Sequence, residues 1–344
     1  MKIAIIVNPS ISVPPLNYGG IERMVFMLIE NLVKKGHSVT LYANKSSQVP
    51  CNLIGYSEDS KYKIFNLIKI NFLTLEIYFK KFDLVHTFGR MSNIAFLMPL
   101  KIPKIVSYQL PPTLSQIQKA LQLAAPNSLV FTGCSDYISN QIKDYCKVTT
   151  IYNGIQIEKF EHSHSFDIDD APLVFLGRIQ YEKGTKEAIE IAKSTGKKLI
   201  IAGNVPKEAI HEKYFKEHIE PQIDGNQITY IGPVNDIEKN KLLGKAAAFL
   251  MPVLWGEPFG IVMTEALACG TPVIGFRQGA IPEVIEDGFN GFVCDTLEQM
   301  IEAVKKIKMI NRENCRLTSL NKFSDKVIFN QYESLYSSLI AKKK

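Results

Sequence analysis

Two glutamates on either side of a glycine turn are the residues whose types and spacing best suit chemistry in this chain. Glu257 and Glu265 stand eight positions apart in the segment WGEPFGIVMTE, residues 255–265, directly after the apolar run 249–253. A helix that begins near Phe259 would place Glu257 on the preceding loop and Glu265 nearly two turns inside. Both carboxylates could then accept hydrogen bonds from ligand hydroxyl groups.

The start of this expected helix could bind an anion. The amides of Gly260, Ile261 and Val262 would lack intrahelical acceptors and would add to the positive end of the helix dipole. A diphosphate suits such a position, with one carboxylate on its sugar side and the other on its ribose side. Taken alone, the segment is explained more simply as an N-terminal cap with two solvated glutamates.

Two cations are expected at the same sheet edge. Gly177 and Arg178 close an earlier apolar run, and Lys183 follows at the start of the next helix. Guanidinium and ammonium groups can hold phosphate oxygens and offset the charge that builds on a leaving diphosphate. A surface arginine and lysine without a ligand remain the alternative.

A second glycine pair, Gly19 and Gly20, precedes a helix expected over 20–35. It permits close approach of the backbone to a phosphate, although plain turn chemistry is the alternative. No G-x-G-x-x-G pattern is present, so the dinucleotide fingerprint is missing.

The elements that must position these residues are short apolar runs alternating with helix-length segments, a pattern typical of parallel α/β sheets. Strands are expected at 2–7, 38–43, 83–88, 104–109, 128–134, 149–152, 173–178, 198–202, 228–231, 248–253, 272–276 and 291–295. Such sheets bind ligands at the carboxyl ends of their strands, where the candidate residues lie.

The length of 344 residues predicts two domains. The polar stretch 161–170 interrupts the pattern and indicates a linker, which gives α/β domains at 1–160 and 171–323. A terminal helix over 324–344 carries an apolar stripe.

Composition indicates a folded globular chain, with 46% hydrophobic and 22% charged residues. No apolar run is long enough to span a bilayer, and the amino terminus resembles a first buried strand more than an export signal. The six cysteines show neither CxxC pairs nor zinc spacing, which predicts a cytoplasmic protein without a bound metal.

Positive charge is concentrated in the first half of the chain. Residues 1–150 hold 16 Lys and Arg against 8 Asp and Glu, whereas the remainder has a net charge of −2. Apolar residues at helical spacing over 64–79 lie among lysines. This segment predicts either a core helix with a lysine rim, the simpler interpretation, or a peripheral contact with the inner face of an anionic membrane. The absence of nucleic-acid-binding motifs argues against nucleic acid as a partner.

The chain resembles a family 4 retaining glycosyltransferase with a GT-B fold, in which two Rossmann-like α/β domains have parallel sheets facing a central cleft. The likeness spans nearly the whole chain. Besides Glu257 and Glu265 in the family's Glu-x7-Glu pattern, it rests on YGGIE at 18–22, DLVH at 83–86, YNGI at 152–155, GR at 177–178, EKG at 182–184, EALACGTPVI at 265–274 and GAIPEVI at 279–285.

The resemblance implies a nucleotide-diphosphate sugar as donor, bound mainly by domain 171–323. Glu265 would take the ribose hydroxyls, and Arg178 and Lys183 the diphosphate. Gly19 and Gly20 would lie on the far side of the diphosphate. The donor sugar and the phosphates would also be contacted by a further set of residues: Gly177, Glu257, Phe259, Gly260, Ile261 and Val262.

The resemblance also implies the course of the reaction. Transfer would retain the anomeric configuration by front-face attack, without a cofactor or metal, with Arg178, Lys183 and Glu257 in the catalytic centre. The acceptor, a glycan, a lipid-linked molecule or a small molecule, would bind mainly to domain 1–160. The terminal helix would cross back to that domain.

One departure from the family pattern affects the sugar site. Gln109 stands where many relatives have a histidine that approaches the donor sugar, and glutamine cannot carry a proton at neutral pH. His86, at the end of an earlier strand, could contact the acceptor, although a packed strand-end histidine is the simpler interpretation.

Asp167-Ile168-Asp169 matches the Asp-x-Asp with which glycosyltransferases of another fold hold a metal. It is interpreted here as linker, because it precedes a strand instead of following one.

Three alternatives to a transferase remain open from the sequence. The first is a sugar-nucleotide-binding protein without transferase activity, in which Gln109 in place of the family histidine marks the lost catalysis. A dinucleotide dehydrogenase would share the architecture but lacks the glycine fingerprint. A nucleotide-sugar epimerase of related fold is the third.

Overall fold

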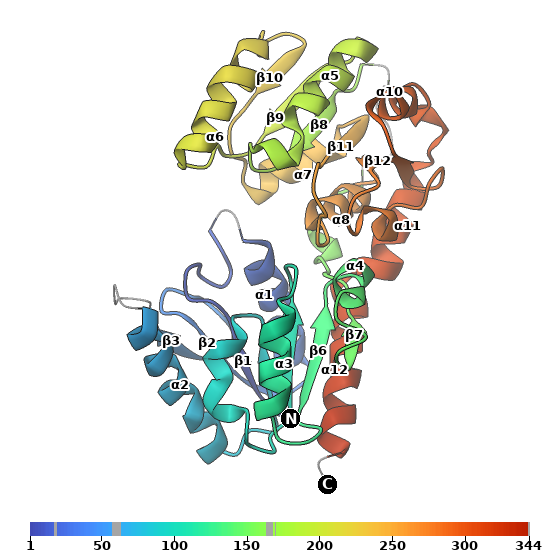
Figure 1. Ribbon diagram of the computed structural model, residues 1–344. Helices are drawn as coiled ribbons and strands as arrows, with labels where there is room; N and C mark the ends of the chain where they lie inside the picture. The colour runs from blue at the N-terminus through green and yellow to red at the C-terminus, as the bar shows by residue number, and fades with distance from the viewer. Residues whose placement is uncertain (17–18, 57–62, 163–167, 169, 343–344) are drawn as a thin grey trace. The chain divides into compact units, whose positions relative to one another are not determined.

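The computed structural model describes residues 1–16, 19–56, 63–162, 168 and 170–342 (Figure 1). The described chain forms two compact units. One consists of Met1–Gly154 together with Asp325–Lys344, and the other of Ile155–Ser324. Each unit is built on its own parallel sheet. The α/β fold class that the alternating pattern predicted is confirmed.

The first unit contains a parallel sheet of seven described strands in the order β3-β2-β1-β4-β5-β6-β7. These strands are β1 (Lys2–Ile6), β2 (Ser38–Asn44), β3 (Asn52–Tyr56), β4 (Leu84–Thr87), β5 (Lys104–Tyr108), β6 (Leu129–Gly133) and β7 (Val148–Thr150). Its helices are α1 (Gly20–Lys34), α2 (Lys63–Phe79), the 3-10 helix η1 (Met91–Leu97), α3 (Leu114–Leu123), α4 (Asp136–Asn140) and α12 (Asp325–Ala341).

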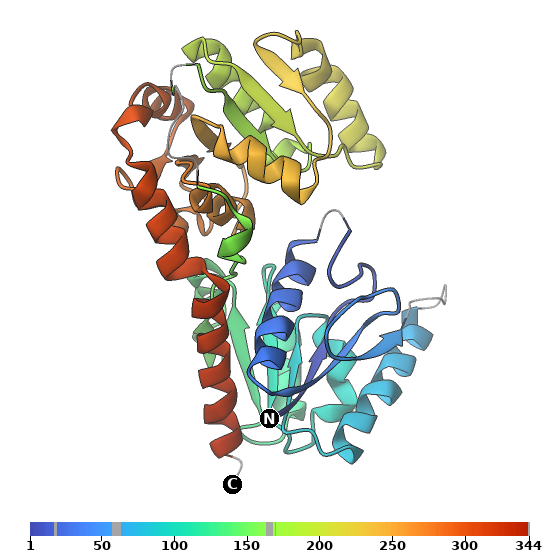
Figure 2. The same cartoon turned by 180° about the vertical axis from the view of Figure 1, so that it is seen from behind.

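Strand β1 shows how this sheet is covered on both faces. Ile3 and Ile5 point into a core formed with α1 and α12, whereas Ala4 and Ile6 point into a second core formed with α2, η1 and α3. Successive strand residues face opposite sides of a sheet, so an unbroken apolar run is what a strand buried on both faces requires. Helices α1 and α12 pack against each other (Figure 2).

The second unit contains a parallel sheet of six described strands in the order β10-β9-β8-β11-β12-β13. These strands are β8 (Leu173–Leu176), β9 (Leu199–Ala202), β10 (Ile228–Tyr230), β11 (Ala248–Met251), β12 (Val273–Phe276) and β13 (Gly291–Cys294). Its main helices are α5 (Thr185–Thr195), α6 (Ala209–Tyr214), α7 (Asp236–Gly244), α8 (Ile261–Ala268), α9 (Ile281–Val284), α10 (Leu297–Lys305) and α11 (Arg312–Phe323), with the 3-10 helix η3 (Tyr181–Lys183) before α5.

The chain passes between the units at Gly154, before the polar stretch 161–170 that the sequence analysis interpreted as a linker. Ile155 and Ile157 already pack against Ala268 of α8, and the Ile155 amide donates to the Phe323 carbonyl over 2.9 Å. Of the Asp-x-Asp segment, Asp167 and Asp169 lie outside the described residues.

Strand β3 is the one described strand that the sequence analysis did not predict. Asn52 is exposed, Leu53 and Ile54 are only half-buried, and Gly55 packs its backbone against Lys45. An edge strand with one half-covered face lacks the continuous apolar run that identified the others.

Candidate functional site

The loop after β8 is fastened to the loop after β11 by its backbone. The Leu254 amide donates to the Glu182 carbonyl over 2.9 Å. Gly184 closes η3 with φ 75°, and a Cβ at this position would lie 1.8 Å from the Pro252 carbonyl oxygen. Only glycine permits this approach. The two loops on either side of the point where the strand order reverses are thereby held together, which brings Lys183 to Glu257.

Lys183, Glu257 and Trp255 form a side-chain cluster at this point. The Lys183 Nζ lies 2.6 Å from Glu257 Oε2, and the Trp255 Nε1–H donates to the same oxygen over 2.8 Å. The Lys183 Nζ also lies 4.9 Å from the Trp255 ring centroid. Glu257 is buried, so its charge needs such partners. We call these three residues the Glu257 cluster.

The loop after β12 supports the Glu257 backbone from the other side. The Ala280 amide donates to the Glu257 carbonyl over 2.9 Å. Gly279 has φ 58°, and a Cβ there would lie 2.2 Å from the same carbonyl oxygen. The GAIPEVI turn therefore positions Glu257 through main-chain contact.

Helix α8 begins at Ile261, two residues later than expected, with Gly260 as its N-cap at φ 77°. The amides of Ile261 and Val262 lie in its first turn, as anion binding requires. Glu265 is consequently the fifth helical residue, just over one turn inside instead of nearly two. The Phe259 side chain is buried and packs edge-on against Phe323, so only its backbone could face a ligand.

Glu265 has a cationic partner that the sequence analysis missed. The Lys239 Nζ of α7 lies 2.5 Å from Glu265 Oε1 and 3.3 Å from Asp236 Oδ1. Both Lys239 and Glu265 have little side-chain exposure, 12% and 8%. No sequence signal could have paired them, because they are 26 positions apart on different helices.

Gly177 and Arg178 begin the loop that ends at Lys183. Gly177 extends β8 by donating its amide to the Ala202 carbonyl over 3.0 Å, and Arg178 is half-buried beside it. A Cβ on Gly203, after the neighbouring strand β9, would lie 1.7 Å from the Gly177 carbonyl oxygen. The backbones therefore meet closely at this edge of the sheet.

Gly19 and Gly20 stand at the start of α1 in the first unit. A Cβ on Gly19 would lie 2.7 Å from Pro15 Cβ and 2.9 Å from Glu22 Oε2. Burial raises the pKa of Glu22 in the first helical turn. The glycine is thus required by close packing, whether or not a ligand approaches.

His86 is a core residue, the packed strand-end histidine that the sequence analysis preferred to an acceptor contact. The residue has no exposed surface, and burial lowers its pKa to about 3. Its Nδ1 lies 2.5 Å from the Tyr336 hydroxyl and its Nε2 lies 2.6 Å from the Ser107 hydroxyl. Both ring nitrogens are therefore occupied inside the first unit.

Gln109 follows β5 and is held by Asn153, from the YNGI motif. The Asn153 Nδ2 donates to Gln109 Oε1 over 2.7 Å. Within the described part of the chain, the buried Gln109 Nε2 and Asn153 Oδ1 have no hydrogen-bond partner. Buried polar atoms of this kind are uncommon and mark a place where a polar ligand could bind.

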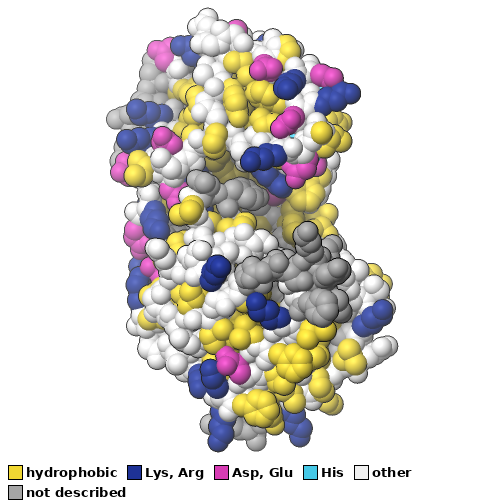
Figure 3. Space-filling view, turned by 90° about the vertical axis from the view of Figure 1, so that its left-hand side faces the viewer, with side chains coloured by type: hydrophobic (Ala, Val, Ile, Leu, Met, Phe, Trp, Pro, Cys, Tyr) yellow, Lys and Arg dark blue, Asp and Glu magenta, His cyan; other side chains and the backbone are white. Residues whose placement is uncertain are grey.

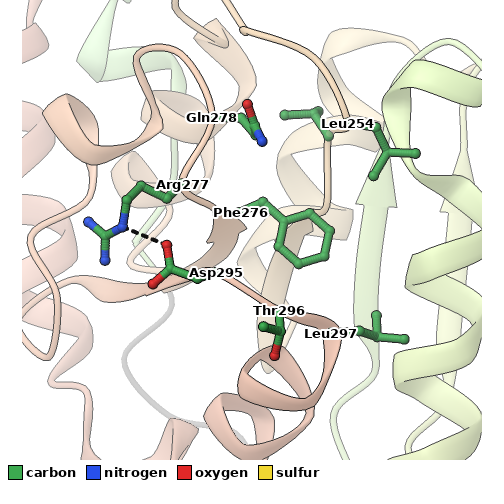
Figure 4. A pocket seen from close by; sticks show the side chains of 8 residues that line it. Leu254, Phe276, Arg277, Gln278, Asp295, Thr296 and Leu297 are labelled. Carbon is green, nitrogen blue, oxygen red and sulfur yellow. Dashed lines mark hydrogen bonds and ion pairs between the residues drawn. The ribbon is translucent and has the colours of Figure 1, made fainter.

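A depression of about 340 Å³ lies at the ends of β11, β12 and β13 (Figure 4). Leu254, Phe276 and Leu297 form its apolar lining, and the Arg277 Nε donates to Asp295 Oδ1 over 2.8 Å. None of the predicted site residues lines it. It adjoins the Glu257 cluster along the chain, since Leu254 precedes Trp255.

Neither a metal cluster nor a membrane-spanning helix is found among the described residues. No group of three or more His, Cys, Asp or Glu side chains in these residues could hold a metal ion. In the same residues, no helix has both the length and the hydropathy to cross a membrane.

Comparisons with known proteins identify the family. Residues 156–325 match the model described as Glycosyl transferases group 1, and residues 18–159 match Glycosyltransferase Family 4.

Two curated relatives match parts of the chain. The chain is 24% identical over 249 residues to N-acetyl-alpha-D-glucosaminyl L-malate synthase of Bacillus anthracis, covering 65% of this chain and 63% of the relative. It is 29% identical over 195 residues to an uncharacterised glycosyltransferase of Methanocaldococcus jannaschii, covering 52% and 47%. The chain thus spans less than two thirds of the length of these relatives.

A solved structure extends the likeness to the whole fold. The Anabaena protein HepE, crystallised with UDP-glucose, is similar with a TM-score of 0.76 at 16% identity, over 98% of this chain and 100% of that one. The family models together run from residue 18 to residue 325, and the resemblance noted in the motifs is confirmed. The chain belongs to family 4 of the glycosyltransferases and has the GT-B fold.

Proposed function

We propose that this protein transfers a sugar from a nucleotide-diphosphate sugar to an acceptor hydroxyl, with retention of the anomeric configuration and without a metal. The Glu257 cluster is the observation that carries the proposal. It places a carboxylate, an ammonium group and an indole at the reversal point of the second sheet, where parallel α/β sheets bind ligands. The UDP-glucose in HepE, a protein of the same fold, supports a donor of this class.

Each donor group has a candidate partner in the second unit. Glu257 would accept hydrogen bonds from hydroxyls of the transferred sugar. Arg178 and Lys183 would face the diphosphate, with the amides of Ile261 and Val262. Glu265, steadied by Lys239, would hold the ribose hydroxyls. In the first unit, Gln109 Nε2, which has no hydrogen-bond partner among the described residues, would donate to the acceptor.

The proposed reaction needs no covalent intermediate. The bond between the anomeric carbon and the diphosphate oxygen breaks, and the acceptor oxygen bonds to the same face of that carbon. The acceptor proton passes to the departing diphosphate. Arg178, Lys183 and the α8 amides would stabilise the negative charge on that leaving group, which is the role a metal ion has in other transferases.

A thermal-shift screen against uridine, guanosine and adenosine diphosphate sugars identifies the donor, because a ligand that binds the native state raises the melting temperature. A transfer assay with the stabilising donor, with glycan, lipid-linked and small-molecule acceptors, then tests turnover. We expect transfer in the presence of EDTA, and NMR of the product should show the donor's anomeric configuration.

Three results would contradict this proposal in different ways. Binding without turnover on any acceptor indicates a sugar-nucleotide-binding protein. Conversion of the donor without an acceptor indicates an epimerase. An inverted product leaves the transferase in place but removes the retaining mechanism.

A further inference from the structure

Helix α2 of the first unit has apolar side chains on its exposed face as well as on the face that packs against the core. Its inner face includes Ile70 and Ile77, which are 4% and 0% exposed and belong to the core beneath the sheet. Leu67, Leu73 and Leu75 pack partly against the same core. One stripe of this kind is sufficient to fix an amphipathic helix on a sheet.

A second apolar stripe faces outward. Ile68, Phe72 and Phe79 are 40%, 64% and 73% exposed, at positions i, i+4 and i+11 of the same helix. Phe96 of η1, 43% exposed, packs edge-on against Phe72 with ring centroids 5.5 Å apart. We call these four residues the α2 patch. Figure 3 shows hydrophobic side chains gathered on this face of the first unit, with Lys and Arg nearby.

The surroundings of the α2 patch are cationic. Lys69, Lys80 and Lys81 are exposed on or directly after the helix. The acid within α2 itself, Glu76, is already engaged, since it pairs with Lys80 over 3.0 Å and accepts a hydrogen bond from the Tyr42 hydroxyl over 2.9 Å. The first unit as a whole holds 20 Lys and Arg against 10 Asp and Glu. The charge complements an anionic surface.

We infer that the α2 patch binds the surface of an anionic lipid bilayer, with the aromatic side chains at headgroup depth and the lysines on anionic lipids. Aromatic and aliphatic side chains on one helix face, with lysines beside them, are what an interfacial helix requires. A contiguous exposed apolar patch also marks a binding surface in a soluble fold. This property concerns the first unit alone, so it can hold or fail independently of donor chemistry in the second.

Co-sedimentation with vesicles tests the inference on the full chain. We expect binding to vesicles of phosphatidylcholine mixed with phosphatidylglycerol, and at least tenfold weaker binding to phosphatidylcholine alone. Phe72→Ser combined with Phe79→Ser should reduce binding to the anionic vesicles at least tenfold. Lys69→Glu combined with Lys81→Glu should remove the preference for anionic lipid, and added salt should do the same in the wild type.

Ile210→Ser combined with Met309→Ser is the matched control, because these side chains are 73% and 76% exposed in the second unit. It should bind vesicles like the wild type. All three double variants change exposed side chains, so far-UV circular dichroism should show wild-type folding.

The inference is wrong if the folded wild type does not sediment with anionic vesicles, or if the control loses binding as strongly as the Phe72 and Phe79 variant. Light scattering measures whether the chain is a monomer or a dimer in solution. A wild-type dimer that becomes monomeric in the Phe72 and Phe79 variant, without vesicle binding, would make the patch a contact between two copies of the chain.

Discussion

At the scale of single residues, the candidate site depends on pairing charges that are removed from water. One carboxylate oxygen of Glu257 accepts hydrogen bonds from Lys183 and Trp255, and Glu265 forms an ion pair with Lys239. Removing one member of a buried pair leaves its partner uncompensated, which costs more than the loss of an exposed pair. The two glutamates therefore need their cations before any donor binds.

Lys183→Met should lower kcat/KM for transfer by about a hundredfold or more, the usual effect of losing a donor that stabilises transition-state charge. The proposed reason is that Lys183 both orients Glu257 and faces the leaving diphosphate. Steady-state kinetics with the identified donor measure it. Lys305→Met is the control, because Lys305 forms an exposed pair with Glu302 on α10 and should leave kcat/KM unchanged. Wild-type kinetics in the Lys183 variant would remove this lysine from the catalytic centre.

Lys239→Met should weaken donor binding more than it lowers kcat, by about tenfold or more, since one charged hydrogen bond contributes about 1.5–3 kcal/mol. The loss of affinity should be smaller for a 2′-deoxynucleotide donor, because the deoxyribose lacks one of the hydroxyls that would donate to the Glu265 carboxylate. Quenching of the chain's single tryptophan, Trp255, gives a binding titration. Lys241→Met, on the exposed side of the same helix, serves as control. An equal loss for both donors would contradict the ribose assignment.

At the scale of elements, glycines at loop crossings decide where the charged residues meet. Gly184 and Gly279 each let one loop lie against the backbone of another. They are followed by the helices α5 and α9, so a small displacement at either glycine moves a loop that carries candidate site residues. These crossings are made by main-chain contacts and not by long side chains.

Gly184→Ala and Gly196→Ala form a matched pair, since both glycines cap α5 with left-handed backbone, at φ 75° and 67°. Alanine in this conformation costs about 1–2 kcal/mol at either end. Only at Gly184 would the new Cβ also meet a backbone atom, the Pro252 carbonyl oxygen, whereas the space around Gly196 is open.

The free energy of unfolding from urea titration should therefore fall further in Gly184→Ala than in Gly196→Ala. Donor binding should weaken only in Gly184→Ala. Equal losses in the two variants would mean that the loop crossing is not tightly held.

At the scale of the whole molecule, the first unit buries the basic side chains of His86 and Lys104. His86 lies in the core of the first unit, with its ring centroid 4.1 Å from that of Phe88 and 5.1 Å from that of Tyr332. Lys104, also without exposed surface, donates to the Leu100 and Ile102 carbonyls, and burial lowers its pKa to about 8. Both groups make the first unit sensitive to pH.

Stability of the first unit should fall as the pH falls from about 6.5 toward 3. The folded pKa of His86 is about 3 and its ordinary value is 6.5, so between these values the unfolded chain binds a proton that the folded chain does not. The free energy of unfolding then decreases by about 1.4 kcal/mol for each pH unit well inside this window. His86→Gln should show a shallower decrease, because glutamine does not titrate.

The two units can be followed separately in this experiment. Trp255 belongs to the second unit, so tryptophan fluorescence reports on that unit, whereas far-UV circular dichroism reports on both. The difference between wild type and His86→Gln should appear in the dichroism and be absent from the fluorescence. Identical pH profiles by dichroism would show that His86 is not kept neutral by the fold.

The sequence by itself determined the two α/β sheets, the family and the loops that carry candidate residues. Apolar runs identify strands buried on both faces, and glycines next to strand ends identify loops, because both signals are local. The edge strand β3 was not predicted, because Asn52 and Gly55 leave only a short apolar run in it.

Only the tertiary structure decided which side chains meet. Lys183 and Glu257 are 74 positions apart, Glu265 pairs with Lys239 of another helix, and His86 meets Tyr336 of α12 and Ser107 of β5. Packing against Tyr336 made His86 a core residue, and the two faces of α2 were separated into buried and exposed stripes by the sheet beneath it. Hydrophobic patterning fixes elements along the chain, whereas pairing and exposure depend on how those elements pack, which no local pattern contains.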